Sequence, residues 1–208
     1  MIKSLLCVAA FGVALSAVAA EEKYPERPVR LLVPFAPGGG ADALSRIITP
    51  KMHDALGQAW VVDNRGGAAG NIAAETVAKA APDGYTALMG FNTVLTVNPS
   101  LYRLPYSVTK DLQPVTLLAT AQYILVVHPS VAASTFKDFI ALARQKPGSL
   151  NYASAGVGSP LHLAAELFKK RAGISMVHLV YKGGGPAATA VLSGEAQVLF
   201  ASVASSVP

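Results

Sequence analysis

The sequence predicts an α/β fold. Short apolar runs rich in Val, Leu and Ile alternate with segments whose apolar residues recur at helical spacing, which is the pattern of βα units on a mostly parallel sheet. Most of the apolar runs do not alternate with polar residues, as is typical of strands covered on both faces. A length of 208 residues allows one large domain or two small ones.

Eight apolar runs are expected to be strands, and three segments carry a clear helical stripe. The strands are expected at residues 29–35, 60–63, 85–90, 114–119, 123–128, 150–155, 176–181 and 196–200, and the stripes lie at 44–56, 136–143 and 161–168. Pro50 should kink the first helix or split it into two pieces. Gly57, Gly173 and Gly194 follow helical patterns, where a C-capping glycine is expected.

A domain boundary is expected near residues 119–122. Two strand patterns follow each other there with almost no loop between them, and no low-complexity linker or internal repeat is visible. One long strand that crosses between two domains would explain this junction and would make it a hinge. The expected organisation is therefore a signal at residues 1–20 and two domains at 21–121 and 122–208.

Residues 1–20 have the three parts of a secretory signal. Lys3 gives the charged start, residues 5–15 give the apolar stretch, and residues 17–20 give a small-residue cleavage site. The apolar stretch is shorter than the roughly 20 residues that span a bilayer. We therefore expect an exported protein. Cys7, the single cysteine, lies inside this signal, so no disulfide or cysteine metal site is expected in the mature chain.

The charge pattern argues against nucleic-acid binding. The formal net charge is only +5, and the longest basic run, residues 169–171, stands at the end of an expected helix without interleaved aromatic residues. Basic residues at that place complement the helix dipole. A small positive surplus also suits anionic ligands.

Three apolar strands lead into glycine-rich turns that open helices, at residues 31–42, 150–159 and 178–185. In parallel α/β sheets such turns lie at the carboxyl ends of the strands, where ligands bind. Free N–H groups at a helix start, with no Cβ in the way, make an anion site. One such turn is weak evidence, because tight βα turns also use glycine for steric reasons. Neither residues 38–42 nor residues 182–186 fit a dinucleotide or phosphate-loop pattern, so no nucleotide cofactor is expected.

Catalytic and metal-binding patterns are scarce. Ser154 and Ser159 lack the flanks of a nucleophile elbow, no His-Glu-x-x-His pattern occurs, and the four histidines are dispersed. No base is paired with a nucleophile at a recognisable spacing, so we expect neither an enzyme nor a metal site. His162 is the histidine nearest the supposed cleft. Asp42 has two equal interpretations, a first-turn carboxylate that suits the helix dipole or a contact to a ligand ammonium or hydroxyl.

An ordered series of motifs runs through the mature chain. It consists of YPERPVRLLVPF at 24–35, PGGGAD at 37–42, DNRGGAAGNI at 63–72, KAAPDGYT at 79–86, NPSLY at 98–102, YASAG at 152–156 and VYKG at 180–183. This series resembles the Bug/TctC family of solute receptors. The resemblance implies a periplasmic, type II binding-protein-like fold, in which two α/β domains close around a cleft on a small carboxylate. It also implies a monomer without a cofactor that delivers its ligand to the membrane permease subunits of a tripartite tricarboxylate transporter.

Members of the family hold the carboxylate largely through main-chain groups and ordered waters, at positions that coincide with the glycine turns. The loop after the third strand, at residues 91–93, is a further candidate. The expected ligand-binding residues are Phe35, Pro37, Gly38, Gly39, Gly40, Ala41, Asp42, Asn92, Thr93, Ser154, Ala155, Gly156, Val157, Gly158, Ser159, Tyr181, Lys182, Gly183 and Gly184.

Two departures from the family pattern bear on function. Family members usually continue well beyond the point where this chain stops, so we expect the second domain and its return segment to be incomplete, with an exposed edge. Gly66 also stands where the family often has proline. The ligand is left open among di- and tricarboxylates, amino acids and aromatic acids. A sensing module for a signalling partner and a non-functional fragment remain alternatives, and an enzyme is the least favoured.

Overall fold

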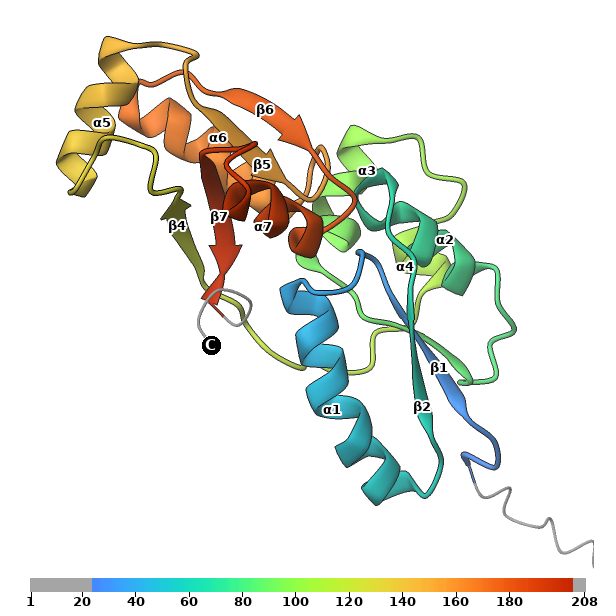
Figure 1. Ribbon diagram of the computed structural model, residues 1–208. Coiled ribbons are helices and arrows are strands. Elements are labelled where there is room, and N and C mark those ends of the chain that lie inside the picture. Colours follow the sequence, from blue (N-terminus) through green and yellow to red (C-terminus); the bar gives the residue numbers. More distant parts are fainter. Residues whose placement is uncertain (1–23, 204–208) are drawn as a thin grey trace, which may run out of the picture.

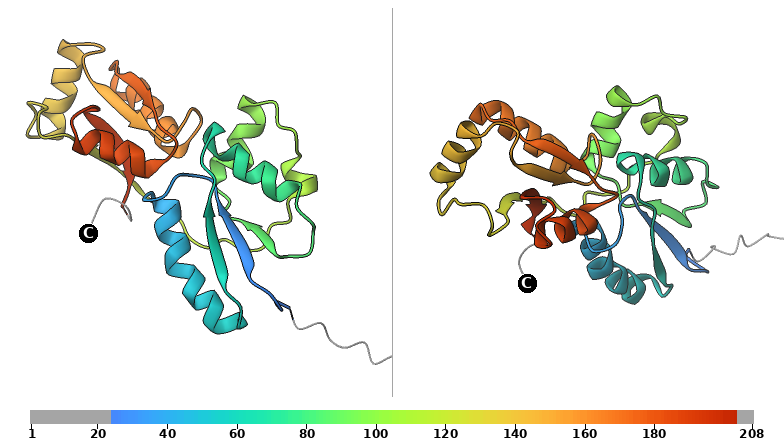
Figure 2. Two further views of the ribbon diagram at one scale, coloured as in Figure 1. Left: turned by 45° about the vertical axis from the view of Figure 1, so that its right-hand side comes forward. Right: turned by 45° about the horizontal axis from the view of Figure 1, so that its top comes forward.

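The computed structural model describes residues 24–203, so the expected signal peptide lies outside the described residues. Two sheets, each covered by helices, form an N-terminal lobe and a C-terminal lobe (Figures 1 and 2). Residues 112–122 join the two lobes. No helix within residues 24–203 has the length and apolar character needed to cross a membrane.

The N-terminal lobe has a parallel three-stranded sheet in the order β2-β1-β3. Its strands are β1 (Val29–Val33), β2 (Trp60–Asn64) and β3 (Thr86–Leu88). Its helices are α1 (Gly40–Leu56), the 3-10 turn η1 (Ala68–Gly70), α2 (Asn71–Ala78), the π-helical turn η2 (Thr93–Val97), α3 (Asn98–Leu101) and α4 (Val108–Asp111). The central strand β1 is buried at every residue except Arg30, which is partly exposed, in keeping with its mostly apolar sequence.

The C-terminal lobe has a four-stranded sheet in the order β4-β7-β5-β6. Its elements are β4 (Tyr123–Val127), α5 (Phe136–Gln145), β5 (Asn151–Ser154), α6 (Pro160–Ala172), β6 (Val177–Val180), α7 (Gly184–Leu192) and β7 (Val198–Ser202). The pairs β5·β6 and β5·β7 are parallel, whereas β4 runs antiparallel to β7. The expected α/β class is therefore confirmed.

The helix ends follow local signals in the sequence. Gly57 and Gly173 adopt left-handed backbone conformations at the ends of α1 and α6, where most residues with a Cβ are disfavoured. Thr135 caps α5 by accepting a hydrogen bond from the Asp138 amide. Pro50 lies inside α1 without splitting it into two helices.

Residues 114–119 are not a strand, which corrects the expectation for this segment. Its apolar residues have no sheet partner among the described residues, and Val115 and Leu117 are 92% and 80% exposed. A strand needs a pairing neighbour as well as β-forming residues. The end of β7 returns to this region, since the Val203 amide donates a hydrogen bond to the Gln122 carbonyl oxygen (3.1 Å).

Candidate functional site

The first and third glycine turns meet between the lobes. The Ala36 amide donates a hydrogen bond to the Lys182 carbonyl oxygen (3.1 Å), and a Cβ on Gly39 would lie 3.3 Å from the Gly184 nitrogen. A Cβ on Gly183 would lie only 2.7 Å from the Ala36 nitrogen. Glycine is therefore required here by the close approach of two backbones.

The second turn meets a different loop of the N-terminal lobe, residues 66–70. A Cβ on Gly156, whose φ is +125°, would lie 3.4 Å from the Cα atom of Ala69. Ala69 itself has a positive φ of 52°, which is a strained backbone for a residue with a Cβ. The Tyr102 hydroxyl donates to the Val157 carbonyl oxygen (2.6 Å) and so ties the same turn to the end of α3.

A pocket with about 450 Å³ of open space, part of it continuous with bulk solvent, lies between the lobes beside these turns. It is lined by Phe35, Gly39, Gly40, Ala41, Phe91, Tyr123, Ala155, Pro160, Leu161, Gly184, Leu199, Ala201 and Ser202. Neither lobe forms this pocket alone.

Three helices begin at the pocket wall. Gly40 and Ala41 open α1, Pro160 and Leu161 open α6, and Gly184 opens α7. The N-caps of α1 and α7 are glycines that supply no side-chain cap, so the first N–H groups of these helices are not used by a capping side chain. Helix N-termini carry partial positive charge, and their convergence makes the pocket attractive to an anion.

The structure brings only part of the expected site residues to the pocket wall. Phe35, Gly39, Gly40, Ala41, Ala155 and Gly184 line it. The others surround the wall or hold the turns, and they are Pro37, Gly38, Asp42, Asn92, Thr93, Ser154, Gly156, Val157, Gly158, Ser159, Tyr181, Lys182 and Gly183. Among the lining residues, Tyr123, Pro160, Leu161, Leu199, Ala201 and Ser202 were missed, and Phe91 was named only as part of its loop. These apolar and hydroxyl residues look like ordinary core residues in the sequence.

Asp42 is used within its own helix and turn. Its carboxylate, on a residue only 6% exposed, accepts a hydrogen bond from the Gly38 amide (3.1 Å) and forms an ion pair with Arg46 (3.1 Å). Burial raises the pKa of Asp42, but hydrogen bonds from Arg46, Gly38 and Asn64 outweigh it and hold the pKa below its ordinary value. The charged carboxylate therefore fixes the first turn.

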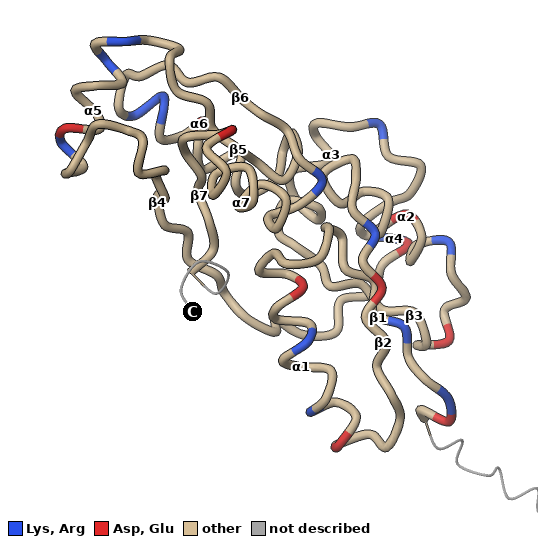
Figure 3. The backbone as a smooth tube through the Cα atoms, viewed as in Figure 1, with Lys and Arg blue, Asp and Glu red and all other residues tan. Residues whose placement is uncertain are grey.

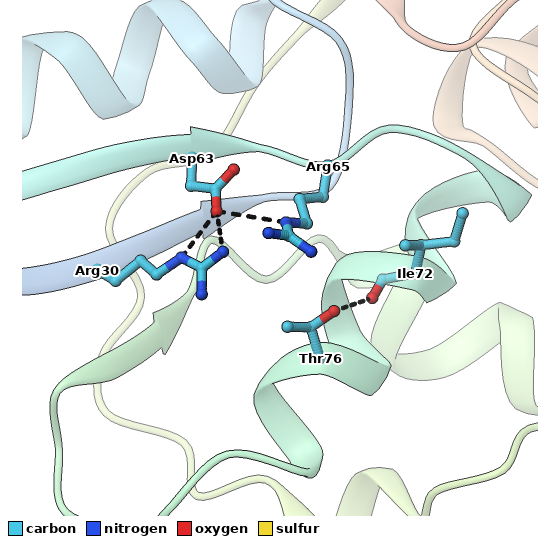
Figure 4. A network of polar contacts seen from close by, with 5 residues as sticks. All are labelled: Arg30, Asp63, Arg65, Ile72 and Thr76. Atoms are coloured by element: carbon cyan, nitrogen blue, oxygen red, sulfur yellow. Dashed lines mark hydrogen bonds and ion pairs between the residues drawn. The ribbon is translucent and has the colours of Figure 1, made fainter.

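A polar network fixes the loop that faces the third turn (Figure 4). Asp63 on β2 binds Arg30 on β1 and Arg65 at the start of the loop, and these arginines, with Arg30 the stronger influence, lower its pKa. The next residue, Gly66, has no room for a side chain, because its Cβ would lie 2.6 Å from the Lys182 carbonyl oxygen. Lys and Arg residues are otherwise scattered over both lobes (Figure 3).

A cluster of titratable residues lies behind the second turn. The Ser154 hydroxyl is 2.6 Å from Nε2 of His178, whose ring stacks on those of Tyr152 and His162 with centroids 4.6 and 4.5 Å away. Glu166 accepts a hydrogen bond from the Tyr152 hydroxyl (2.5 Å). Burial, followed by the neighbouring His162, lowers the pKa of His178 to about 4, so its ring is neutral near neutral pH.

The contact between Ser154 and His178 is a serine–histidine pair that the sequence analysis did not find. The two residues come from neighbouring strands, β5 and β6, which a search for short motifs does not connect. Ser154 is fully buried and also accepts a hydrogen bond from the Gly156 amide (3.1 Å). Among the described residues, no carboxylate is hydrogen-bonded to His178 as an orienting group would be. The hydrogen bond from the Gly156 amide to Ser154 connects this pair to the second turn.

Two α/β lobes around an interlobe pocket, with the first residues of three helices in its wall, are the architecture of the bilobed solute-binding proteins. Residues 44–208 match the family of the tripartite tricarboxylate transporter family receptor, TctC, and the chain belongs to this family. The resemblance of its motifs to the Bug/TctC receptors is thus confirmed.

Curated relatives share more than a third of the aligned residues. The UPF0065 protein in the tcbD-tcbE intergenic region of Pseudomonas sp. (strain P51) is 43% identical over 188 residues, which are 88% of this chain and 55% of that protein. Protein BugT of Bordetella pertussis is 38% identical over 195 residues, which are 91% of this chain and 60% of BugT. The chain therefore spans little more than half the length of these relatives.

Several solved structures have the same fold as this chain. A periplasmic transporter superposes with a TM-score of 0.83 at 41% identity, covering 88% of this chain and 62% of that one. R. palustris Rpa4515 with adipate gives 0.82 at 34% identity, with coverages of 89% and 62%. MatC (Rpa3494) from Rhodopseudomonas palustris with bound malate gives 0.82 at 32% identity, with coverages of 89% and 63%. The expected two-domain binding-protein fold is confirmed.

Proposed function

We propose that this chain is the ligand-capturing part of an exported, non-catalytic receptor for a small carboxylate. The observation that carries the proposal is the meeting of three helix N-termini, those of α1, α6 and α7, at one pocket whose lining residues include no charged side chain. Such a wall binds an anion through backbone N–H groups and helix dipoles.

Family membership and the ligands of solved relatives support the same proposal. Rpa4515 was solved with adipate and MatC with malate, and both of these ligands are small carboxylates. We propose that the receptor works in the periplasm as a monomer and passes its ligand to the membrane permease subunits of a tripartite tricarboxylate transporter. A ligand-sensing role would use the same pocket, and neighbouring genes for the two permease subunits would favour transport.

We further propose that residues 119–122 act as the hinge between domains at 21–121 and 122–208. Residues 112–122 belong to no helix or strand. Such a segment changes its backbone angles at little cost, whereas each lobe is held by its own sheet. Opening about this hinge would separate the glycine turns of the two lobes, which are in contact in the structure.

Thermal unfolding of the purified protein with a panel of carboxylates tests the proposal. A ligand that binds only the folded state raises the melting temperature by mass action. Each acid should be compared with its amide, for example adipate with adipamide, because the amide has the same shape without the charge. Stabilisation by at least one acid but not by its amide is expected. Equal effects of acids and amides, or none, would contradict carboxylate capture.

A further inference from the structure

A hydrogen bond from a side chain to the backbone joins the two lobes at residues 98–102. The Tyr102 hydroxyl, directly after α3 in the N-terminal lobe, donates to the Val157 carbonyl oxygen of the second glycine turn at 2.6 Å. Burial raises the pKa of Tyr102, so the hydroxyl keeps its proton and remains a donor at neutral pH. Since its two partners belong to different lobes, this bond exists only while the lobes touch.

The second turn is held firmly by its own lobe. The Gly156 amide donates to Ser154 Oγ (3.1 Å). The Gly158 amide donates to Nδ1 of His162 (3.2 Å). These amides are therefore used inside the C-terminal lobe, whereas the Val157 carbonyl group between them bonds to the other lobe. The turn is a preformed partner, and little backbone order has to be gained when the lobes meet.

Asn98 faces the second turn from the N-terminal lobe. Its fully buried carboxamide donates from Nδ2 to the Ala69 carbonyl oxygen (3.1 Å) and to Asn71 Oδ1 (2.7 Å). Because both N–H groups are used, the carboxamide cannot turn over without losing two hydrogen bonds. Its oxygen is thus held toward the second turn, where a Cβ on Gly158 would lie 3.2 Å from it.

The Asn98 oxygen has no hydrogen-bond partner among the described residues. A buried acceptor without a partner is unfavourable, and separation of the lobes would give it access to water. This oxygen therefore favours the open arrangement, whereas the bond between Tyr102 and Val157 favours the closed one. The two effects are comparable in size, so the loss of the Tyr102 bond should shift the balance toward the open arrangement.

We propose that Tyr102 is a positioning residue that acts as a latch, with its hydroxyl stabilising the closed arrangement of the lobes before any ligand enters. A hydrogen bond of this kind changes an equilibrium constant roughly three- to tenfold, which is enough to alter the open and closed populations. The latch also slows ligand release, a consequence that rests on the proposed function.

Single-molecule energy transfer between the lobes measures the two populations without ligand. Dyes are attached at Lys110→Cys on α4 and Lys137→Cys on α5, two exposed residues in different lobes, in a background that carries Cys7→Ser. We expect Tyr102→Phe to raise the ratio of open to closed molecules roughly three- to tenfold. An unchanged ratio in the folded variant would overturn the proposal.

Tyr24→Phe is the matched control for this measurement. It also removes a tyrosine hydroxyl that donates to a carbonyl oxygen, that of Gly84 at 2.7 Å, but both residues belong to the N-terminal lobe. The ratio of open to closed molecules should therefore stay at the value of the unmodified protein. The same increase in Tyr24→Phe as in Tyr102→Phe would overturn the assignment of the latch to Tyr102.

A methyl group added from the other side of the contact gives a second test. Gly158→Ala places a Cβ 2.9 Å from Leu101 Cδ1, so it should also raise the open fraction. Gly148→Ala is the control, because its φ of +74° is close to the +82° of Gly158 but nothing lies within 4 Å of the added Cβ. Equal ratios in these two variants would contradict the latch. Added to Tyr102→Phe, Gly158→Ala should have little further effect, because both act on one contact.

Ligand release separates the latch from the proposed function. With an acid that stabilises the protein, stopped-flow dissociation should be roughly three- to tenfold faster in Tyr102→Phe than in the unmodified protein. Equal dissociation rates would overturn the effect on release. If no acid binds, the proposed function fails, while energy transfer in the ligand-free protein still decides whether Tyr102 is a latch.

Discussion

The hydrogen bond from the Ala36 amide to the Lys182 carbonyl oxygen joins the first glycine turn to the third across the two lobes. Gly66 lies against both of its atoms, since a Cβ there would be 2.6 Å from the Lys182 oxygen and 2.9 Å from the Ala36 nitrogen. Three segments far apart in the sequence thus share one closely packed contact.

Gly66→Ala should therefore favour a more open arrangement of the lobes. The added methyl group cannot coexist with the hydrogen bond between Ala36 and Lys182, because all the nearest atoms belong to backbone. Small-angle scattering should show a larger radius of gyration than in the unmodified protein. Gly184→Ala is the matched control, because its Cβ would have ordinary contact, 3.5 Å, with the Cα atom of Gly39. Equal radii for the Gly66 variant and the control would contradict the steric argument.

Ligand recognition should depend more on backbone approach than on the Lys182 side chain. Gly39→Val and Gly156→Val add bulk that meets Gly184 and Ala69 of the opposite lobe, so each should weaken carboxylate binding by about tenfold or more, or ~1.4 kcal/mol. Lys182→Ala removes an exposed side chain and should cost less. Titration of each folded variant with the same acid measures the difference. Full affinity in both glycine variants would show that the turns do not form the site.

Local patterns were enough to predict most of the fold. Seven of the eight expected strands form, because unalternating runs such as that of β1 and turns such as residues 37–40 carry their signals within a few residues. The prediction of a strand at residues 114–119 was wrong, because a strand also needs a pairing neighbour, which the sequence does not reveal. The antiparallel pairing of β4 with β7 likewise depends on contacts between distant parts of the chain.

The candidate site was predictable only where glycine marks it. The turns at Gly39 and Gly184 stand out in the sequence, and the structure places both at the pocket wall. Tyr123 and Leu199 also line the pocket, but they lie on strands β4 and β7. Their apolar sequence pattern is the same as that of core residues, so it does not mark them as site residues. The contact between Ser154 and His178 depends on the register of β5 and β6, which single-sequence patterns do not specify.

Thr93 offers a way to separate a structural residue from a ligand-binding one. Its hydroxyl is buried and has no hydrogen-bond partner among the described residues. Thr93→Val keeps the shape and removes the unpaired polar group, so it should raise the free energy of unfolding by roughly 0.5–2 kcal/mol. Urea unfolding without ligand measures this, and Thr76→Val on α2 is the control, because it removes a made hydrogen bond to Ile72 (2.8 Å). If Thr93→Val instead destabilises the protein, its hydroxyl makes a favourable interaction.

The stability of the protein should fall as the pH drops from about 6.5 to about 4. Burial lowers the pKa of His178 from 6.5 to about 4, so in this window the unfolded chain binds more protons than the folded one. His162, whose pKa is also lowered by burial, acts in the same direction. Glu166 and Lys169 also lie near His178 and have opposite charges. They form an ion pair with each other, with 2.6 Å between Lys169 Nζ and Glu166 Oε1.

Urea midpoints measured across that pH window test the role of this cluster. His178→Gln cannot take up the proton, so it should flatten the decline. His53→Gln is the control, because His53 lies in the last turn of α1 in the other lobe. A decline of the same steepness in His178→Gln as in the unmodified protein would show that His178 does not titrate as its buried position predicts.

The connection between the lobes should limit affinity in the 208-residue chain. Within the described residues the chain passes from one lobe to the other once, through residues 112–122, and a single connection leaves the axis of closure free. Binding then has to order the two lobes at a cost in entropy. The hydrogen bond between Val203 and Gln122 brings the end of β7 back beside this connection, where a continuing chain would add a second one.

A chain extended to the length of its relatives should therefore bind the same carboxylate more tightly than this one. The extension should also cover Leu117, which is 80% exposed here. Leu117→Ser should then change the free energy of unfolding by no more than about 0.5 kcal/mol in the 208-residue chain but destabilise the extended one. Calorimetry on both chains measures the affinities, and urea unfolding measures the two effects of Leu117→Ser. Equal dissociation constants would show that one connection between the lobes is sufficient and that the hinge does not limit binding.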